Sequence, residues 1–195
     1  VFGCFNNTYK ISSKEFSIWM SLLSKINNSY LILLVNDEIT KNNLTKEIIN
    51  NNQDPSRVKF LNFINNDEHL ARHQLIDLYL DTFNYNGHTS TVDALYAGVP
   101  VVTKIGKSFT SRVCARILKA VNMPKLITYN QEEYLNLAFE IATNKKKYKK
   151  LKLDLRYNLE RSVLFNTKKY VKNLEKGYEL ALKSRANNDK IEYIE

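Results

Sequence analysis

The sequence predicts an α/β fold, a Rossmann-like doubly wound parallel sheet followed by C-terminal helices. Short apolar runs and amphipathic stretches alternate along residues 1–128, which is typical of β-α-β units that build a parallel sheet. The clearest run, from Tyr30 to Val35, is apolar throughout and suits a strand buried on both faces. Three helical stretches close the chain, at residues 131–143, 145–160 and 167–184.

The first two units show the alternation most plainly. Residues 1–5 are predicted as a short strand, and Ser12 with Glu15 predicts a capping box at the start of a helix over residues 13–26. Apolar residues recur along that helix at helical spacing, at Phe16, Trp19, Met20, Leu22, Leu23 and Ile26. Residues 30–35 are the second predicted strand, and a helix is expected over residues 40–51.

The remaining elements follow the same rule. Further strands are predicted at residues 58–63, 78–81, 101–103 and 126–127, and helices at residues 67–76, 91–97 and 109–122. In open sheets of this class, ligands bind beyond the carboxyl ends of the strands. We therefore look for chemistry in the loops that follow Phe5, Phe63 and Asp81.

Composition excludes several protein classes. The chain has 195 residues, of which 44% are hydrophobic, so it can bury a sizeable core. Its two cysteines are too few for a disulfide framework or a four-cysteine metal site. No apolar run approaches the roughly 20 residues that span a bilayer. No secretion leader is evident, which indicates the cytosol or nucleus, and the start at Val1 leads us to expect part of a longer protein.

The net charge of +9 raises the alternative of a nucleic-acid or anionic-surface binding module. The excess of basic side chains lies mainly near the C-terminus. Residues 145–195 hold 15 basic and 7 acidic side chains, whereas residues 1–144 hold 14 basic and 13 acidic ones. A lysine run over residues 145–150 carries much of it. Such runs are most often solvated helix faces, so we expect no nucleic-acid partner.

The loop over residues 81–93 is the richest in chemistry. It leaves a strand, crosses a turn and enters a helix at Thr89 or Ser90, and a helix N-terminus attracts phosphate. His88 can donate a hydrogen bond to an anion, and Asp93 either closes a capping box with Ser90 or binds a sugar hydroxyl. An ordinary Ser/Thr helix cap is the structural alternative. Without a Walker or G-x-G-x-x-G loop, a nucleotide would depend on hydroxyls, this helix end and a lysine.

Two further loops offer candidate ligands for a nucleotide. Lys10 is placed to face a diphosphate, with Asn7 as an amide donor, although a solvated surface lysine fits the same pattern. His69 and Arg72 share one helix face and could hold a base by stacking and hydrogen bonds, unless they only form an exposed helix start. His69 and His73 have a spacing that could bind zinc, but no third ligand is evident, so we expect no metal site.

Six segments together resemble the C-terminal catalytic half of the O-GlcNAc transferases, the family 41 glycosyltransferases. They are residues 5–11, 68–72, 80–89, 97–100, 111–113 and 164–168. The resemblance covers nearly the whole chain, and its most specific part is Asn86-Gly-His-Thr89 with the downstream Asp93. It implies the C-terminal half of a GT-B glycosyltransferase, with a nucleotide-sugar-binding domain over residues 1–144 and basic helices over residues 145–195 that pack on it.

The resemblance also implies a role for eleven residues in one donor site. Lys10 would be the catalytic residue, because it would stabilise the charge that grows on the leaving diphosphate. The others would bind the donor: Asn7 at the diphosphate; His88, Thr89 and Ser90 at the helix-end phosphate; Asp93 and Asn66 at the ribose; His69, Arg72 and Ile64 at the uridine; and Tyr85 near the sugar.

The activity implied is transfer of N-acetylglucosamine from UDP-GlcNAc to Ser/Thr hydroxyls of proteins, with inversion and without a cofactor or metal. The implied partners are acceptor proteins and the N-terminal catalytic half and helical repeats of the same polypeptide. The Spindly relatives use GDP-fucose and lack a histidine at the His88 position, although Phe5-Asn-Asn is Spindly-like. A non-catalytic assembly domain is a third alternative, against which Lys10, His88 and Asp93 argue.

Overall fold

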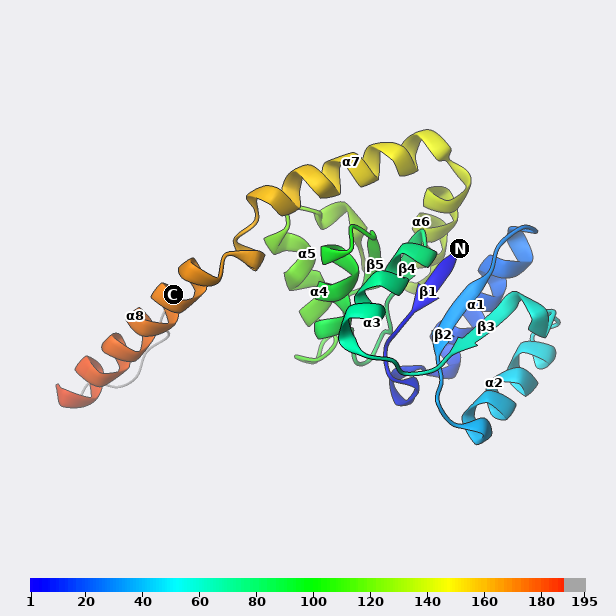
Figure 1. The fold of residues 1–195 in the computed structure, drawn as a ribbon, viewed down its shortest axis with the longest axis horizontal. Coiled ribbons are helices and arrows are strands. Elements are labelled where there is room, and N and C mark those ends of the chain that lie inside the picture. Colours follow the sequence, from blue (N-terminus) through cyan, green and yellow to red (C-terminus); the bar gives the residue numbers. More distant parts are fainter. Residues whose placement is uncertain (188–195) are drawn as a thin grey trace.

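The computed structural model describes residues 1–187 and contains a six-stranded, wholly parallel sheet (Figure 1). Its strands are β1 (Phe2–Cys4), β2 (Leu31–Leu34), β3 (Val58–Leu61), β4 (Leu78–Leu80), β5 (Val101–Lys104) and β6 (Ile127–Thr128). They run in the order β3-β2-β1-β4-β5-β6. The strands are added toward one edge of the sheet from β1 to β3 and toward the other edge from β4 to β6. This change of winding between β1 and β4 confirms the predicted doubly wound α/β fold.

The helices alternate with the strands as the sequence predicts. They are α1 (Ser13–Lys25), α2 (Glu38–Asn50), α3 (Asn66–Arg72), α4 (Thr89–Tyr96), α5 (Val113–Ala120), α6 (Gln131–Thr143), α7 (Lys145–Arg161) and α8 (Thr167–Ala186). Asparagine side chains accept a backbone N–H at several of their starts, at Asn65, Asn130, Asn144 and Asn166. The abundant asparagines thus serve partly as helix caps.

The core fixes the carboxyl end of β4, where the site lies. The four residues of β2 are all buried, as expected of a strand covered on both faces. Helices α1 and α6 pack together, and Trp19 Nε1 donates to Tyr134 Oη at 3.3 Å. Tyr134 Oη in turn donates to the carbonyl of Asp81 at 3.0 Å. These two hydrogen bonds therefore connect the contact between α1 and α6 to Asp81, the residue that follows β4.

Two predicted helices are shorter than expected. The helix predicted over residues 109–122 begins only at Val113, because a turn of hydroxyl side chains precedes it. Ser108 Oγ accepts from the backbone N–H of Ser111 at 3.3 Å, and Gly106 N–H donates to the Ser111 carbonyl at 2.8 Å. The helix predicted over residues 67–76 ends at Arg72 and continues as a short 3₁₀ turn, His73–Leu75.

The C-terminal helices behave differently from each other. Helix α7 packs on the domain through the buried Leu151 and Leu155, whereas α8 buries no residue and projects away from the sheet (Figure 1). Residues 145–195 are expected to pack on the domain; among the described residues α7 does so, whereas α8 contributes no buried residue. The last eight residues of that range, 188–195, lie outside the described part of the chain.

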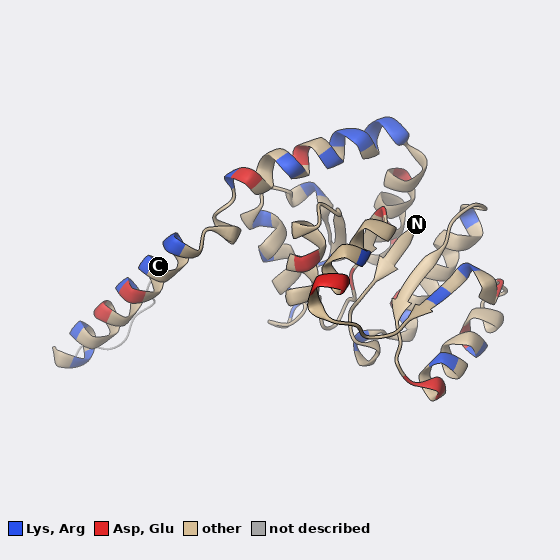
Figure 2. Ribbon diagram, viewed as in Figure 1, with Lys and Arg blue, Asp and Glu red and all other residues tan. Residues whose placement is uncertain are grey.

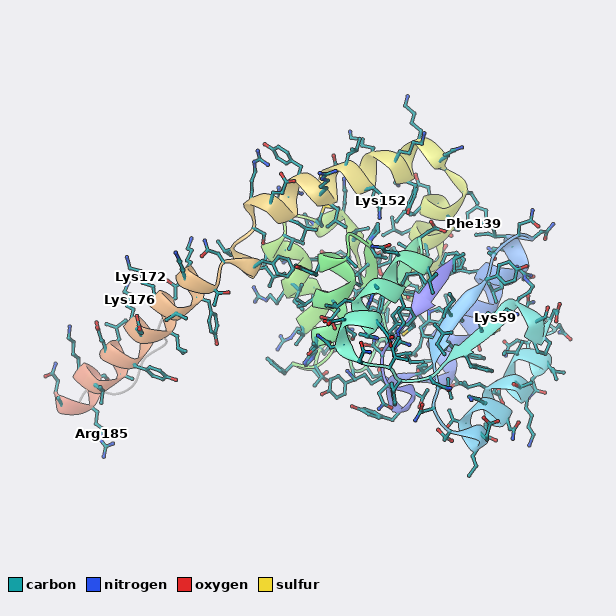
Figure 3. The ribbon with its side chains drawn as sticks, viewed as in Figure 1. Lys59, Phe139, Lys152, Lys172, Lys176 and Arg185 are labelled. Atoms are coloured by element: carbon teal, nitrogen blue, oxygen red, sulfur yellow. The ribbon has the colours of Figure 1, made fainter. Side chains whose placement is uncertain are left out.

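The basic residues follow the division that the sequence indicates. Figure 2 shows lysines crowded at the start of α7, and Figure 3 shows Lys172, Lys176 and Arg185 along the projecting α8. These helices lie apart from the loops at the carboxyl end of the sheet (Figure 1). Within residues 1–187, no helix is both long and apolar enough to cross a membrane.

Candidate functional site

A cleft of about 560 Å³ opens at the carboxyl end of the sheet. The loops after β1 and β3 and the loop from β4 into α4 form its walls, as the switch point between β1 and β4 requires. All eleven predicted site residues line it: Asn7, Lys10, Ile64, Asn66, His69, Arg72, Tyr85, His88, Thr89, Ser90 and Asp93. Three loops that are distant in sequence therefore converge on one site.

The loop after β1 places the lysine. Asn7 caps the 3₁₀ turn Thr8–Lys10, because its side chain accepts from Tyr9 N–H at 3.4 Å. Lys10 Nζ donates to the Asn86 carbonyl at 3.3 Å and lies 3.9 Å from the centroid of the Tyr85 ring. Burial lowers the pKa of Lys10, and the nearby Asp81 carboxylate opposes that shift. Lys10 is thus a held, partly buried cation rather than a freely solvated one.

The N-terminus of α4 opens into the same cleft. Its N-cap is His88, which makes no side-chain capping bond. The neighbouring hydroxyls are engaged elsewhere, because Ser90 Oγ donates to Asn6 Oδ1 and Thr91 Oγ1 donates to the Gly87 carbonyl at 2.8 Å. Neither the ordinary Ser/Thr cap nor the capping box of Ser90 with Asp93 is therefore formed. The first N–H groups of α4 are left without a side-chain cap, which suits an anion.

His88 adds a polar atom to this helix end. Its Nε2 is buried and has no hydrogen-bond partner among residues 1–187. Burial lowers the pKa of His88, and the Lys10 charge lowers it further, so the imidazole is neutral near pH 7. An unpartnered ring nitrogen beside a lysine and a helix N-terminus favours a ligand that can complete its hydrogen bond.

A buried carboxylate organises this side of the cleft. Asp81 Oδ1 accepts from Gly87 N–H at 2.6 Å and from Asn6 Nδ2 at 3.1 Å, while its Oδ2 accepts from Thr103 Oγ1 at 2.7 Å. Asn6 Oδ1 then accepts from Ser90. Burial raises the pKa of Asp81 to about 6, against the hydrogen bonds from Thr103 and Gly87. The β1 loop and the start of α4 are thereby tied to one group.

The opposite side of the cleft is built around Phe5. The Phe5 ring lies 5.8 Å from the His69 ring and 5.8 Å from the Arg72 guanidinium carbon. Arg72 Nη1 donates to the Asn62 carbonyl at 2.8 Å, which fixes the guanidinium. Burial lowers the pKa of His69, and His73 and Arg72 lower it further. A neutral imidazole and a guanidinium can together stack on and hydrogen-bond a base.

His73 does not share this surface. Its Nδ1 lies 2.9 Å from the His69 carbonyl, and its ring stacks on the buried Tyr79 at 6.4 Å between centroids. The ring is fully buried, so the spacing of His69 and His73 reflects helix geometry and core packing. Within residues 1–187, no three His, Cys, Asp or Glu side chains gather as a metal site would require.

Asp93 faces the cleft from α4. It is partly buried, and burial raises its pKa while the charge interaction with His69 opposes that rise. Ile64 and Asn66 lie on the exposed rim. A carboxylate and an amide can accept hydrogen bonds from ribose hydroxyls, which is the role that the resemblance implies for Asp93 and Asn66.

Several residues of the site were not predicted from the sequence. The cleft is also lined by Phe5, Asn6, Tyr9, Leu34 and Phe63, and Asp81 lies buried behind it. The position of Asn6 and Asp81 at the ends of two predicted strands is the signal that could have found them. Their roles depend on contacts between loops that are far apart in sequence.

Comparisons with known proteins identify the family of the chain. The family model for glycosyl transferase family 41 matches residues 1–174. A UDP-N-acetylglucosamine–peptide N-acetylglucosaminyltransferase of Caenorhabditis elegans is 33% identical over 175 residues, which are 90% of this chain and 15% of that protein. The SPINDLY protein of Solanum lycopersicum is 32% identical over 181 residues, covering 91% of this chain and 19% of that protein. The chain thus spans less than a fifth of the length of these relatives.

Solved structures give the same result. The chain superposes on an O-GlcNAc transferase mutant from Thermobaculum terrenum with a TM-score of 0.85 and 27% identity, over 91% of this chain and 35% of that one. Sucrose-phosphate synthase from Thermosynechococcus elongatus shares the fold alone, with a TM-score of 0.67 and 13% identity over 94% of this chain and 46% of that one. These neighbours are GT-B glycosyltransferases. By its sequence, its fold and the family model that covers most of its length, the chain belongs to glycosyl transferase family 41.

Proposed function

We propose that this chain is the nucleotide-sugar-binding half of a protein O-GlcNAc transferase, which transfers N-acetylglucosamine from UDP-GlcNAc to Ser/Thr hydroxyls. One observation carries the proposal: Lys10 and the open N-terminus of α4, whose N-cap is His88, meet in a single cleft. Such a set of cationic and N–H groups suits a diphosphate. The family and the printed function of the Caenorhabditis elegans relative support the sugar and the acceptor.

The proposed reaction inverts the anomeric carbon. The acceptor oxygen bonds to the anomeric carbon as the bond from that carbon to the diphosphate breaks. The hydroxyl proton passes to solvent water, and UDP leaves with the electron pair of the broken bond. Lys10 and the N–H groups of α4 stabilise the charge on the leaving diphosphate. The scheme assigns no step to a metal ion or cofactor. In the longer protein that contains this chain, we expect the rate of transfer to be unchanged in excess EDTA. Loss of transfer in EDTA that only a divalent cation restores would contradict the scheme.

GDP-fucose is the second candidate donor, because Phe5-Asn-Asn resembles the Spindly relatives, which the family resemblance associates with that sugar. Titration of the chain with UDP and with GDP separates the two. We expect weak, UDP-selective binding that is lost in His88→Ala and kept in Phe109→Ala, a neighbour of His88 outside the cleft. GDP-selective binding would favour the fucosyltransferase, and equal or absent binding of both would contradict the proposal.

Transfer itself requires the rest of the protein. The chain spans 15–19% of its relatives, so we infer that an N-terminal catalytic half and acceptor-binding helical repeats complete the enzyme, and that the chain alone transfers nothing. In the longer protein, Lys10→Ala should abolish transfer while sparing the fold. The scarcity of cysteines supports a cytosolic or nuclear enzyme, and we expect no nucleic-acid partner. Salt-dependent RNA binding that UDP does not affect would oppose that view.

A further inference from the structure

Aromatic rings form a contact chain along the rim of the cleft, and Lys10 lies against its middle member. The Tyr85 ring is 6.2 Å from the Tyr9 ring and 5.2 Å from the His88 ring. Lys10 Nζ lies 3.9 Å from the Tyr85 centroid, well inside the roughly 6 Å range of cation–π attraction. The Asn86 carbonyl accepts from the same ammonium at 3.3 Å. Two adjacent residues thus hold one cation.

The position of the Tyr85 ring is set by a buried turn. Thr82 Oγ1 donates to the Tyr85 carbonyl at 2.6 Å, and Asn86 Nδ2 donates to the Thr82 carbonyl at 2.6 Å. Asn86 N–H also donates to the Thr110 carbonyl at 3.0 Å. None of these three bonds uses the Tyr85 side chain, so a substitution of that side chain leaves the turn in place. The ring can therefore be removed without moving its support.

A ring and a carbonyl are suitable partners for a lysine that must meet an anion. A carboxylate would neutralise the ammonium and compete with a diphosphate, whereas an aromatic face attracts a cation and leaves its net charge available. An unheld lysine has four rotatable bonds, and ordering it on binding costs free energy. Contact with Tyr85 and Asn86 restricts the Lys10 side chain before a ligand arrives, so less conformational entropy is lost on binding.

We propose that Tyr85 is a positioning residue. Its ring face holds the Lys10 ammonium at the side of the cleft formed by Asn6 and the N-terminus of α4, which is called the phosphate side. The inference deepens the proposed function and rests on it for the identity of the ligand, a nucleoside diphosphate. The contact itself is a property of the ligand-free chain. It can therefore be tested separately from nucleotide binding.

The first test is a spectroscopic one on the ligand-free chain. A cation over a ring lies in its shielding cone, so the Lys10 Hε signals should be shifted upfield in a ¹H–¹³C spectrum, with the assignment made by their loss in Lys10→Ala. Tyr85→Phe should keep the shift and Tyr85→Leu should abolish it. The matched control is Tyr96→Leu, an exposed tyrosine at the other end of α4. An unshifted wild-type signal, or one that survives Tyr85→Leu, overturns the proposal.

The second test is titration of the same variants with UDP and with pyrophosphate. Tyr96→Leu should bind both as the wild type does, whereas Tyr85→Leu should bind both about threefold to tenfold more weakly, and Tyr85→Phe, which keeps the ring, should bind both more tightly than Tyr85→Leu. Wild-type affinity in Tyr85→Leu, with its thermal melt unchanged, would overturn the positioning role. Absence of UDP binding to the wild type would overturn the proposed function, and the ring-current result would still report on the contact.

Discussion

The two sides of the cleft are built differently, although both are loops at the end of one sheet. On the phosphate side, Asn6 and Asp81 are 2% and 0% exposed and are tied together by hydrogen bonds. On the base side, Phe63 and Ile64 are 56% and 45% exposed, and Asn66 lies on an open rim. The phosphate side is thus an extension of the core, whereas much of the base side is a surface loop.

This difference assigns separate tasks to the two sides. Buried, hydrogen-bonded groups are preorganised, so the phosphate side can stabilise developing charge without rearranging. A loop with few buried contacts opens at low free energy and can adjust to a ligand. Substitutions of the buried groups on the phosphate side should therefore affect both stability and anion binding, and substitutions of the exposed residues on the base side should affect nucleotide selection alone.

The largest effect is expected from Asp81→Ala. The substitution leaves Asn6 Nδ2, Gly87 N–H and Thr103 Oγ1 without their buried acceptor. Each unsatisfied buried donor costs about 1–3 kcal/mol, so the free energy of unfolding should fall by about 3 kcal/mol or more. Urea unfolding followed by circular dichroism measures it.

The matched substitution on the base side is Asn66→Ala. Asn66 is exposed in the first turn of α3, so its loss should change the free energy of unfolding by less than about 0.5 kcal/mol. Equal destabilisation by Asp81→Ala and Asn66→Ala would abolish the distinction between the two sides.

The next effect concerns the anion. Lys10→Ala removes a charge-assisted contact worth about 1.5–3 kcal/mol, so affinity for pyrophosphate and for UDP should both fall about tenfold to a hundredfold. Lys14→Ala, at an exposed lysine in α1 outside the cleft, is the control for general loss of charge. Equal losses in the two variants would mean that net charge, and not the placed ammonium, attracts the anion.

A pH-dependent effect of comparable size isolates the buried carboxylate. Burial raises the pKa of Asp81 to about 6 from 3.8, so the folded state binds this proton more tightly than the unfolded state. The stability contributed by Asp81 should therefore fall as pH rises from about 4 to about 6, by up to about 1.4 kcal/mol per pH unit. Urea unfolding of wild type and Asp81→Asn over that range measures the difference, and parallel pH profiles would contradict the assignment.

The sequence predicts only part of the phosphate side. The apolar run at residues 30–35 and the cap region at Thr89 belong to local patterns, so the sheet and the helix-end site could be predicted. The clamp of Asn6 on Asp81 joins residues 75 positions apart, and no local pattern encodes it. The same limit explains α8, whose amphipathic pattern predicts packing but does not identify what covers it.

The smallest effect separates the two sides by ligand. His69 lies on the base side, against Phe5, and the loss of one neutral contact to a base is worth about 0.5–1.5 kcal/mol. His69→Ala should therefore weaken UDP binding about threefold to tenfold and leave pyrophosphate binding unchanged, whereas Lys10→Ala weakens both. Isothermal titration with the two ligands measures this contrast. If His69→Ala weakened pyrophosphate binding as much as UDP binding, the histidine would act on the phosphate side, and the division of the cleft would be wrong.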